Sequence, residues 1–184
     1  MKKLFMVVLG CTPKDRLIEQ HDIFFGIAEE LKDLVEEMKN FWPVDDLHID
    51  CWKIIEQVGN YKVVINEKPS ETENKEKQLF FINLGGYLPN IFEELHYKTV
   101  VVASDKAEAI KQVKATDFYK VNSYKGAESH IDDQYGIDID EIFTINEVLR
   151  PNFKNKFSID LITTDEIFEE PKMNNGYLKL SKLK

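Results

Sequence analysis

The sequence predicts an α+β protein made of two tandem copies of one ββαββ unit, each with one helix packed on a mostly antiparallel or mixed sheet. Two observations lead to this prediction. The chain resembles itself when it is shifted by 75 residues. In each repeat, short apolar runs typical of strands flank a stretch in which apolar residues recur at helical spacing. We expect the two units to be related by a pseudo-twofold axis.

The internal repeat covers residues 4–39, which align without a gap with residues 79–114. Eight of these thirty-six positions are identical, whereas roughly two identities are expected by chance. Most of the other apolar positions remain apolar. The identical polar residues include Glu19 with Glu94 and His21 with His96. The repeat therefore favours an internal duplication.

The strands of each copy are predicted from apolar runs and from alternation of apolar and polar residues. They are residues 4–9, 22–27, 47–55 and 61–65 in the first copy, and 79–84, 97–102, 137–145 and 157–163 in the second. The helix of the first copy is expected over 27–42, where apolar residues recur every three or four positions. In the second copy, Ser104 is the expected N-cap. Residues 58–60 predict a hairpin turn.

The domain organisation follows from changes in composition along the chain. We expect a first unit at 1–66, a polar linker at 67–77, a second unit at 78–164 with an insertion near 118–136, and a C-terminal tail at 165–184. The linker is rich in Glu, Lys and Asn, which is typical of a solvated connection. Pro171 and the Asn174-Asn175-Gly176 run interrupt the tail, so it is expected to fray or to dock on a partner.

Composition and charge exclude several classes of partner. The 184 residues are 43% hydrophobic and 31% charged, with a net charge of −9, so the chain can form a core but repels phosphate groups. We therefore expect no nucleic-acid and no membrane partner. The N-terminal apolar run is too short for a membrane span. The two cysteines, Cys11 and Cys51, lack metal-ligand spacing and fit a reducing compartment, which predicts a cytoplasmic protein.

Several short segments carry a resemblance to a known family. They are Leu-Gly-Cys-Thr-Pro-Lys (9–14), Ile-Glu-Gln-His-Asp (18–22), Leu-Gly-Gly-Tyr (84–87), Glu-Leu-His-Tyr-Lys (94–98) and Ser-His-Ile-Asp-Asp (129–133). Together they resemble the uncharacterised bacterial family catalogued as domain of unknown function 1543, which is described as occurring in one or two copies per chain. The resemblance covers roughly residues 3–150 and implies two copies here. It implies no activity, substrate or cofactor.

The repeated Glu-x-His is the first candidate for a functional site. A spacing of two directs the side chains of Glu19 and His21 to one side of an extended segment. A carboxylate beside an imidazole can hold a divalent metal or orient the ring for proton transfer. About a pseudo-twofold axis, this pair and its repeat, Glu94 with His96, would converge on one site. A structural hydrogen bond in each copy also explains the pairs.

Two further motifs have a functional and a simpler interpretation. Cys11 follows a predicted strand and, with His21, could form an activated thiolate, but a cysteine is also a good small core residue. His-Ile-Asp occurs twice, at 48–50 and 130–132. We assign the first copy to the polar face of an amphipathic strand, and strand continuity aligns Asp50 with Asp140, which would place the second copy in the insertion. The acidic stretch 132–141 lacks the EF-hand pattern and predicts a solvated turn.

No catalytic triad or cofactor-binding motif is present in the sequence. The first functional hypothesis is therefore a small intracellular binding or interaction protein without catalytic activity. It would act as a homodimer or with a protein partner, through exposed aromatic residues such as Tyr87, Phe92, Tyr119 or Tyr135. The alternative is a metal-dependent or acid–base hydrolase that uses the repeated Glu-x-His pairs. Only this alternative requires a cofactor, which would be a divalent metal.

Overall fold

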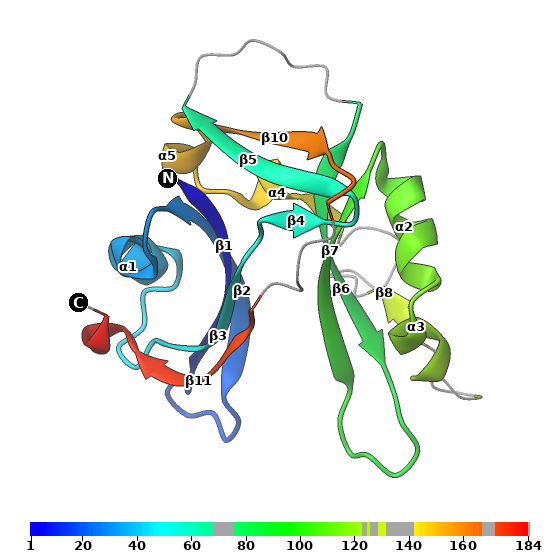
Figure 1. Ribbon diagram of the computed structural model, residues 1–184. Helices are drawn as coiled ribbons and strands as arrows, with labels where there is room; N and C mark the ends of the chain where they lie inside the picture. The colour runs from blue at the N-terminus through cyan, green and yellow to red at the C-terminus, as the bar shows by residue number, and fades with distance from the viewer. Residues whose placement is uncertain (68–75, 123–124, 126–128, 132–141, 167–171, 184) are drawn as a thin grey trace. The chain divides into compact units, whose positions relative to one another are not determined.

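The computed structural model describes residues 1–67, 76–122, 125, 129–131, 142–166 and 172–183. The chain divides into two compact units, whose elements are labelled in Figure 1. Unit 1 comprises Met1–Glu71 and Leu149–Lys184, and unit 2 comprises Thr72–Val148. In both units the described strands pair in antiparallel fashion and the helices are short. The predicted α+β class is confirmed. No helix in the described ranges is long and apolar enough to cross a bilayer.

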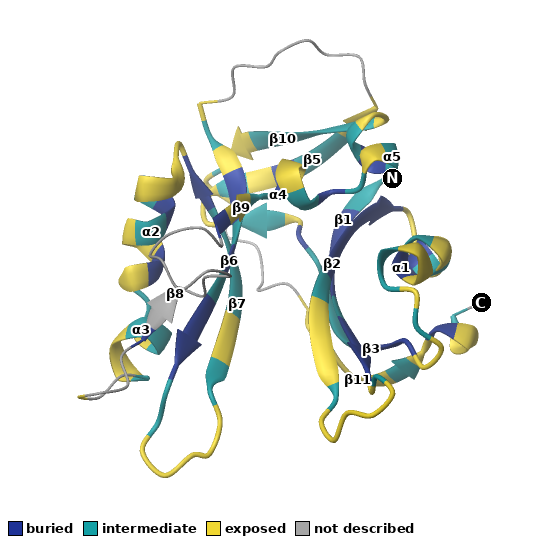
Figure 2. Cartoon of the chain, turned by 180° about the vertical axis from the view of Figure 1, so that it is seen from behind, coloured by how far each residue is buried: buried dark blue, intermediate teal, exposed yellow. Residues whose placement is uncertain are grey.

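The main sheet of unit 1 has the strand order β11-β3-β1-β2. Its strands are β1 (Lys3–Cys11), β2 (Gln20–Ala28), β3 (His48–Ile54) and β11 (Asn174–Lys179). The central strand β1 is buried along nearly its whole length, as its apolar run predicts, whereas the start of β2 is exposed (Figure 2).

The helical segment of unit 1 begins later than predicted. A 3-10 turn, η1 (Leu31–Leu34), leads into α1 (Val35–Phe41). Leu34 and Met38 are fully buried. Ile27, which we expected at the start of the helix, lies in β2 and pairs with Leu4 of β1. The apolar spacing was misleading here because Ile27, a buried strand residue, lies four positions before Leu31 and so continues the spacing of the helix.

A second sheet of unit 1 has the order β10-β5-β4. Its elements are β4 (Gln57–Val58), β5 (Tyr61–Glu67) and β10 (Phe157–Thr163), the last preceded by α5 (Pro151–Lys154). Gly59 has a φ of +58° in the β4–β5 turn, so the predicted hairpin is confirmed. β10 pairs with β5 over seven residues and therefore belongs to unit 1, not to the second unit in which we expected it.

The C-terminal tail completes the main sheet of unit 1. β11 pairs with β3, and the 3-10 turn η2 (Leu180–Lys182) that follows it buries Leu180. The described part of the tail, residues 172–183, is therefore docked on its own chain, and the prediction that it frays or docks on a partner was wrong for these residues. The break expected at Asn174-Asn175-Gly176 is a β-bulge within β11, where Gly176 has a φ of +130°.

Unit 2 has a sheet of order β7-β6-β8, with β9 also paired to β6. The strands are β6 (Gln78–Gly86), β7 (Leu95–Ala103), β8 (His130–Ile131) and β9 (Ile142–Thr144), and the helices are α2 (Lys106–Lys114), α3 (Asp117–Val121) and α4 (Ile145–Val148). Its core contains Phe80, Ile82, Leu84, Ala103, Ala109, Val113 and Ile142. The expected linker lies mostly, and the acidic stretch 132–141 wholly, outside the described residues.

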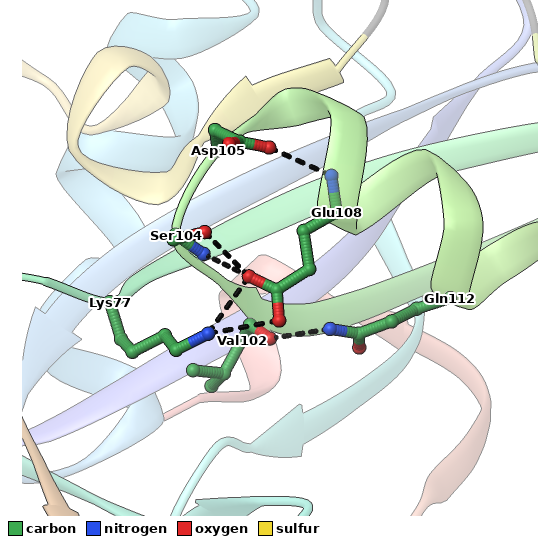
Figure 3. A network of polar contacts seen from close by, with 6 residues as sticks. All are labelled: Lys77, Val102, Ser104, Asp105, Glu108 and Gln112. Atoms are coloured by element: carbon green, nitrogen blue, oxygen red, sulfur yellow. Dashed lines mark hydrogen bonds and ion pairs between the residues drawn. The ribbon is translucent and has the colours of Figure 1, made fainter.

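The start of α2 is held by the network of polar contacts in Figure 3. Asp105, not Ser104, is the N-cap, and its side chain accepts a hydrogen bond from the backbone N–H of Glu108. The Glu108 carboxylate accepts bonds of 2.7 Å from both the N–H and the hydroxyl of Ser104. It also binds Lys77 Nζ at 2.8 and 2.9 Å. Ser104 thus bonds to the side chain of Glu108 instead of capping the helix.

Replacing Glu108 with glutamine is expected to destabilise unit 2 at neutral pH but much less at pH 3. The hydrogen bond from Lys77, with those from Ser104, lowers the pKa of Glu108 from 4.5 to about 2. A lowered pKa means that the carboxylate stabilises the fold above pH 4.5 and that this contribution fades as the pH falls towards 2. Thermal unfolding of both proteins at the two pH values measures the difference. Glu93→Gln, at an exposed glutamate, is the control, and an equal loss at both pH values would contradict the expectation.

Candidate metal centre

Gly10, near the end of β1, is the centre of a polar cluster in unit 1. In the sheet register it lies opposite His21 on β2 and opposite His48 on β3. Because glycine has no side chain, the neighbouring side chains can lean over it. A Cβ atom at this position would clash with Asp50 Oδ2 and lie 2.7 Å from His48 Nε2. The space that a side chain would take is therefore filled by polar groups from two other positions.

Asp50 reaches the cluster through a β-bulge. Val8 pairs with Cys51 and Leu9 with Ile49, which leaves Asp50 as an extra residue on β3. Bulges of this kind redirect side chains and are common beside active sites. The fourth member, Glu19, is the last loop residue before β2. The loop, two strands and a bulge thus bring together two carboxylates and two imidazoles.

The ligand atoms of these four residues are spaced as they would be around one metal ion. His48 Nε2 lies 2.8 Å from Glu19 Oε1 and 3.4 Å from Asp50 Oδ1. His21 Nε2 lies 3.1 Å from Asp50 Oδ2 and 3.5 Å from Glu19 Oε2. Ligands about 2.0–2.1 Å from a tetrahedral ion are separated by about 3.3 Å. Glu19, His21 and Asp50 each offer an atom within 4.8 Å of the others.

The His48 ring is the best-defined member of the cluster, with 4% of the residue exposed. Its Nδ1 lies 2.9 Å from the carbonyl oxygen of Asp46, which can only accept a hydrogen bond, so Nδ1 carries a proton. Nε2 is buried and has no hydrogen-bond partner in the part of the chain that is described. Its 2.8 Å contact with Glu19 therefore lacks the direction of a hydrogen bond. A neutral ring with Nδ1–H bound to a carbonyl is the usual state of a metal-binding histidine.

The cluster is closed on one side and open on the other. The His48 side chain is 5% exposed, whereas those of His21, Glu19 and Asp50 are 42%, 38% and 28% exposed. Structural zinc sites fill four coordination positions with protein ligands, whereas catalytic sites keep a further position for water or substrate and can become five-coordinate. The open side of this cluster leaves room for a water molecule as a fifth ligand beside the four side chains.

Tyr177 covers the His48 ring from the C-terminal strand. The ring centroids are 4.4 Å apart, and the planes are inclined at 40°. Tyr177 follows Gly176 in the bulge of β11, which adds one residue between the pairs Asn175–Cys51 and Leu178–Ile49. This bulge allows Tyr177 to lie beside His48, which the sequence analysis did not foresee.

Cys11 lies next to the cluster but lacks the properties of a nucleophile. Its side chain is buried, with 1% of the residue exposed. Burial, with smaller contributions from the nearby carboxylates of Glu19 and Asp46, raises the thiol pKa above its ordinary value of 9.0. The thiol is therefore protonated at neutral pH, whereas nucleophilic attack requires the thiolate.

The second Glu-x-His lies in unit 2. His96 Nε2 is 3.7 Å from Glu94 Oε2, and the Tyr87 hydroxyl donates a 2.7 Å hydrogen bond to Glu94 Oε1. The structure thus groups each pair with residues of its own unit. Among the other aromatic residues expected to face a partner, Phe92 is fully exposed and Tyr119 packs against the core of unit 2. Tyr135 lies outside the described residues.

Sequence reasoning named two of the four cluster residues, Glu19 and His21. It assigned His48 and Asp50 to the polar side of a strand, because a strand pattern does not reveal which residues of the next strand lie opposite. Two available signals pointed to them. One was the repeated His-Ile-Asp, and the other was the glycine that ends the apolar run of β1.

Comparisons with known proteins agree with the fold and leave the activity open. Residues 16–65 match a family model described as Domain of Unknown Function (DUF1543), and this segment contains all four cluster residues. The chain is similar to the crystal structure of protein Il1583 from Idiomarina loihiensis, with 21% identity, 99% coverage of both chains and a TM-score of 0.60. No curated protein matches the sequence. The similarity to Il1583 shows a shared fold, and the family match includes one copy of the unit.

Proposed function

We propose that this protein binds a divalent transition-metal ion through Glu19, His21, His48 and Asp50. The observation that carries the proposal is the buried Nε2 of His48, which faces two carboxylates and has no hydrogen-bond partner among the described residues. A buried ring nitrogen that faces two anionic groups is unfavourable unless a cation, either a metal ion or a proton on the ring, lies between them. Imidazole ligands favour zinc, copper, iron or nickel over magnesium and calcium.

Metal-dependent hydrolysis is a second candidate function, and the exposed side of the cluster favours it. A metal ion bound there would lower the pKa of a coordinated water and so supply a nucleophile at neutral pH. His48 and Asp50 would hold the ion from the buried side. His21 and Glu19, which are more exposed, would also border the open position. The hypotheses of a homodimer, a protein partner and a purely non-catalytic binding role remain predictions.

We also infer that the two units arose by duplication. β1 and β6 have bounds that differ by the same 75 residues as the sequence repeat, and so do β2 and β7. The hairpin loops between them agree in detail, since Asp15 and Asn90, at equivalent positions, have φ values of 64° and 66°. A left-handed residue that is not glycine is uncommon. Its recurrence at equivalent positions supports descent from one hairpin.

Cobalt substitution tests the proposed ligand set. We expect Co²⁺ added to the untagged protein to give visible d–d absorption of a site with nitrogen and oxygen ligands, without a thiolate charge-transfer band. Asp50→Asn should weaken binding by more than the roughly 10- to 100-fold that changes outside the ligand shell cause. Asp45→Asn, at an exposed carboxylate of the loop before β3, is the matched control. Unchanged Co²⁺ affinity in Asp50→Asn, or a strong thiolate band, would contradict the proposal.

A further inference from the structure

We infer that unit 2 holds a second divalent-metal site, formed by Glu94 and His96 at the position in the sheet where the backbone register also places His130. This inference rests on the proposed function of unit 1 and extends it to a region for which the family match gives no information. It starts from the four histidines of the chain. Two of them flank Gly10 in the sheet of unit 1, and the other two flank Gly85 in the sheet of unit 2.

The backbone register of the two sheets is the same around these glycines. Gly85 on β6 pairs with His96 on β7, as Gly10 pairs with His21. On its other side Gly85 pairs with His130 on β8, as Gly10 pairs with His48. The His-Ile pairs at 48–49 and 130–131 therefore occupy equivalent backbone positions. His130 is placed by this register alone.

β8 and β9 together take the place that β3 has in unit 1. Residues 142–144 of β9 pair with residues 82, 81 and 80 of β6. In unit 1, residues 52–54 of β3 pair with the equivalent residues 7, 6 and 5 of β1. β8 is shifted by 82 residues from its equivalents in β3, and β9 is shifted by 90. The expected alignment of Asp50 with Asp140 has the second of these shifts, whereas the second His-Ile, which we expected in an insertion, is paired like the first. Residues 132–141 are outside the described part of the chain, and the inference does not use them.

The side chains of Glu94 and His96 are already arranged as metal ligands would be. Glu94 Oε2 and His96 Nε2 lie 3.7 Å apart at the start of β7. The hydrogen bond from Tyr87 occupies Oε1 of Glu94, and Oε2 is the oxygen nearer to His96. Hydrogen bonds of this kind fix the orientation of ligating carboxylates. In unit 1 the position of Tyr87 is taken by Thr12, so the two sites would differ in their surroundings.

Zinc stoichiometry of the full-length, untagged chain tests this inference. Isothermal titration with Zn²⁺ is expected to give two ions per wild-type chain. His96→Ala and His130→Ala should each bind one ion, and so should His48→Ala, which retains only the unit 2 site. Glu93→Gln, beside Glu94, is the control and should bind two. Circular dichroism checks the fold of each variant, and the histidine ring signals in a proton NMR spectrum report which rings respond to zinc.

The variants separate this inference from the proposal for unit 1. One ion in the wild type, lost in His48→Ala but retained in His96→Ala and His130→Ala, would overturn the second site and leave the first. If the wild type binds one ion that His48→Ala retains and His96→Ala loses, the proposed site in unit 1 would be overturned instead. One ion lost in every histidine variant would contradict two separate sites. If His130→Ala does not fold, zinc-dependent shifts of only two of the four histidine signals in the wild type would equally refute the second site.

Discussion

In a His96→Ala background, which leaves unit 1 with the one proposed site, replacing His48 with alanine is expected to abolish the stabilisation of the protein by zinc. Because His48 would hold the ion from the buried side, its loss should remove tight binding in unit 1. At a free zinc concentration 100 times the dissociation constant, binding stabilises the folded state by about 2.7 kcal/mol. For a chain of this size that corresponds to a rise in Tm of roughly 5–10 °C. Thermal unfolding with zinc and with a chelator measures the difference.

The same substitution should also cost stability when the metal is absent, because it removes a buried ring, its contact with Tyr177 and its hydrogen bond to the carbonyl oxygen of Asp46. The zinc effect is therefore measured within each protein, as the difference in Tm between zinc and chelator. Asp45→Asn serves as the control and should keep the full zinc-dependent rise in Tm. To isolate unit 1, the measurement is made in the His96→Ala background. An unchanged zinc effect in the His48→Ala chain would contradict the assignment of His48 as a ligand.

Gly10→Ala is expected to remove metal binding from unit 1 and to destabilise it. The new methyl group would clash with Asp50 Oδ2 and approach His48 Nε2 to 2.7 Å, so both ligands would have to move. Overpacking of this kind typically costs about 1–3 kcal/mol. Zinc titration and chemical denaturation, again in the His96→Ala background, measure the two effects.

Gly26→Ala provides a matched control for this change. A methyl group on Gly26 would lie 2.7 Å from Phe24 Cε1 and 2.8 Å from Leu34 Cδ2, both in the apolar core. This variant should therefore lose a similar amount of stability while its zinc affinity stays close to that of the parent chain. Equal loss of zinc affinity in both variants would indicate that general destabilisation, and not displacement of the ligands, explains the effect of Gly10→Ala.

The sequence was most informative where structure is local. The strands at 157–163 and around 4–9 were predicted nearly to the residue, because an apolar or alternating run forms a strand whichever neighbour it meets. The Glu19–His21 pair was also found, since its spacing of two lies within one segment.

Features that depend on pairing between distant segments were missed. β10 lies beside β5, and β11 lies beside β3, although many residues separate these strands in the sequence. His48 and Asp50 were assigned to the polar face of a strand and not to a site, because their convergence on His21 depends on the register with β1 and on a bulge. Neither the register nor the bulge follows from composition or periodicity.

The metal content of untagged protein, purified without chelators or immobilised metal, tests the central claim most directly. Elemental mass spectrometry of the wild type and of a chain lacking Glu19, His21, His48 and Asp50 (each replaced by alanine) should be compared at equal protein concentration. The account predicts that the wild type carries about one more equivalent of zinc, copper, iron or nickel per chain than the variant. Wild-type protein that remains free of these metals after incubation with each of them would contradict it.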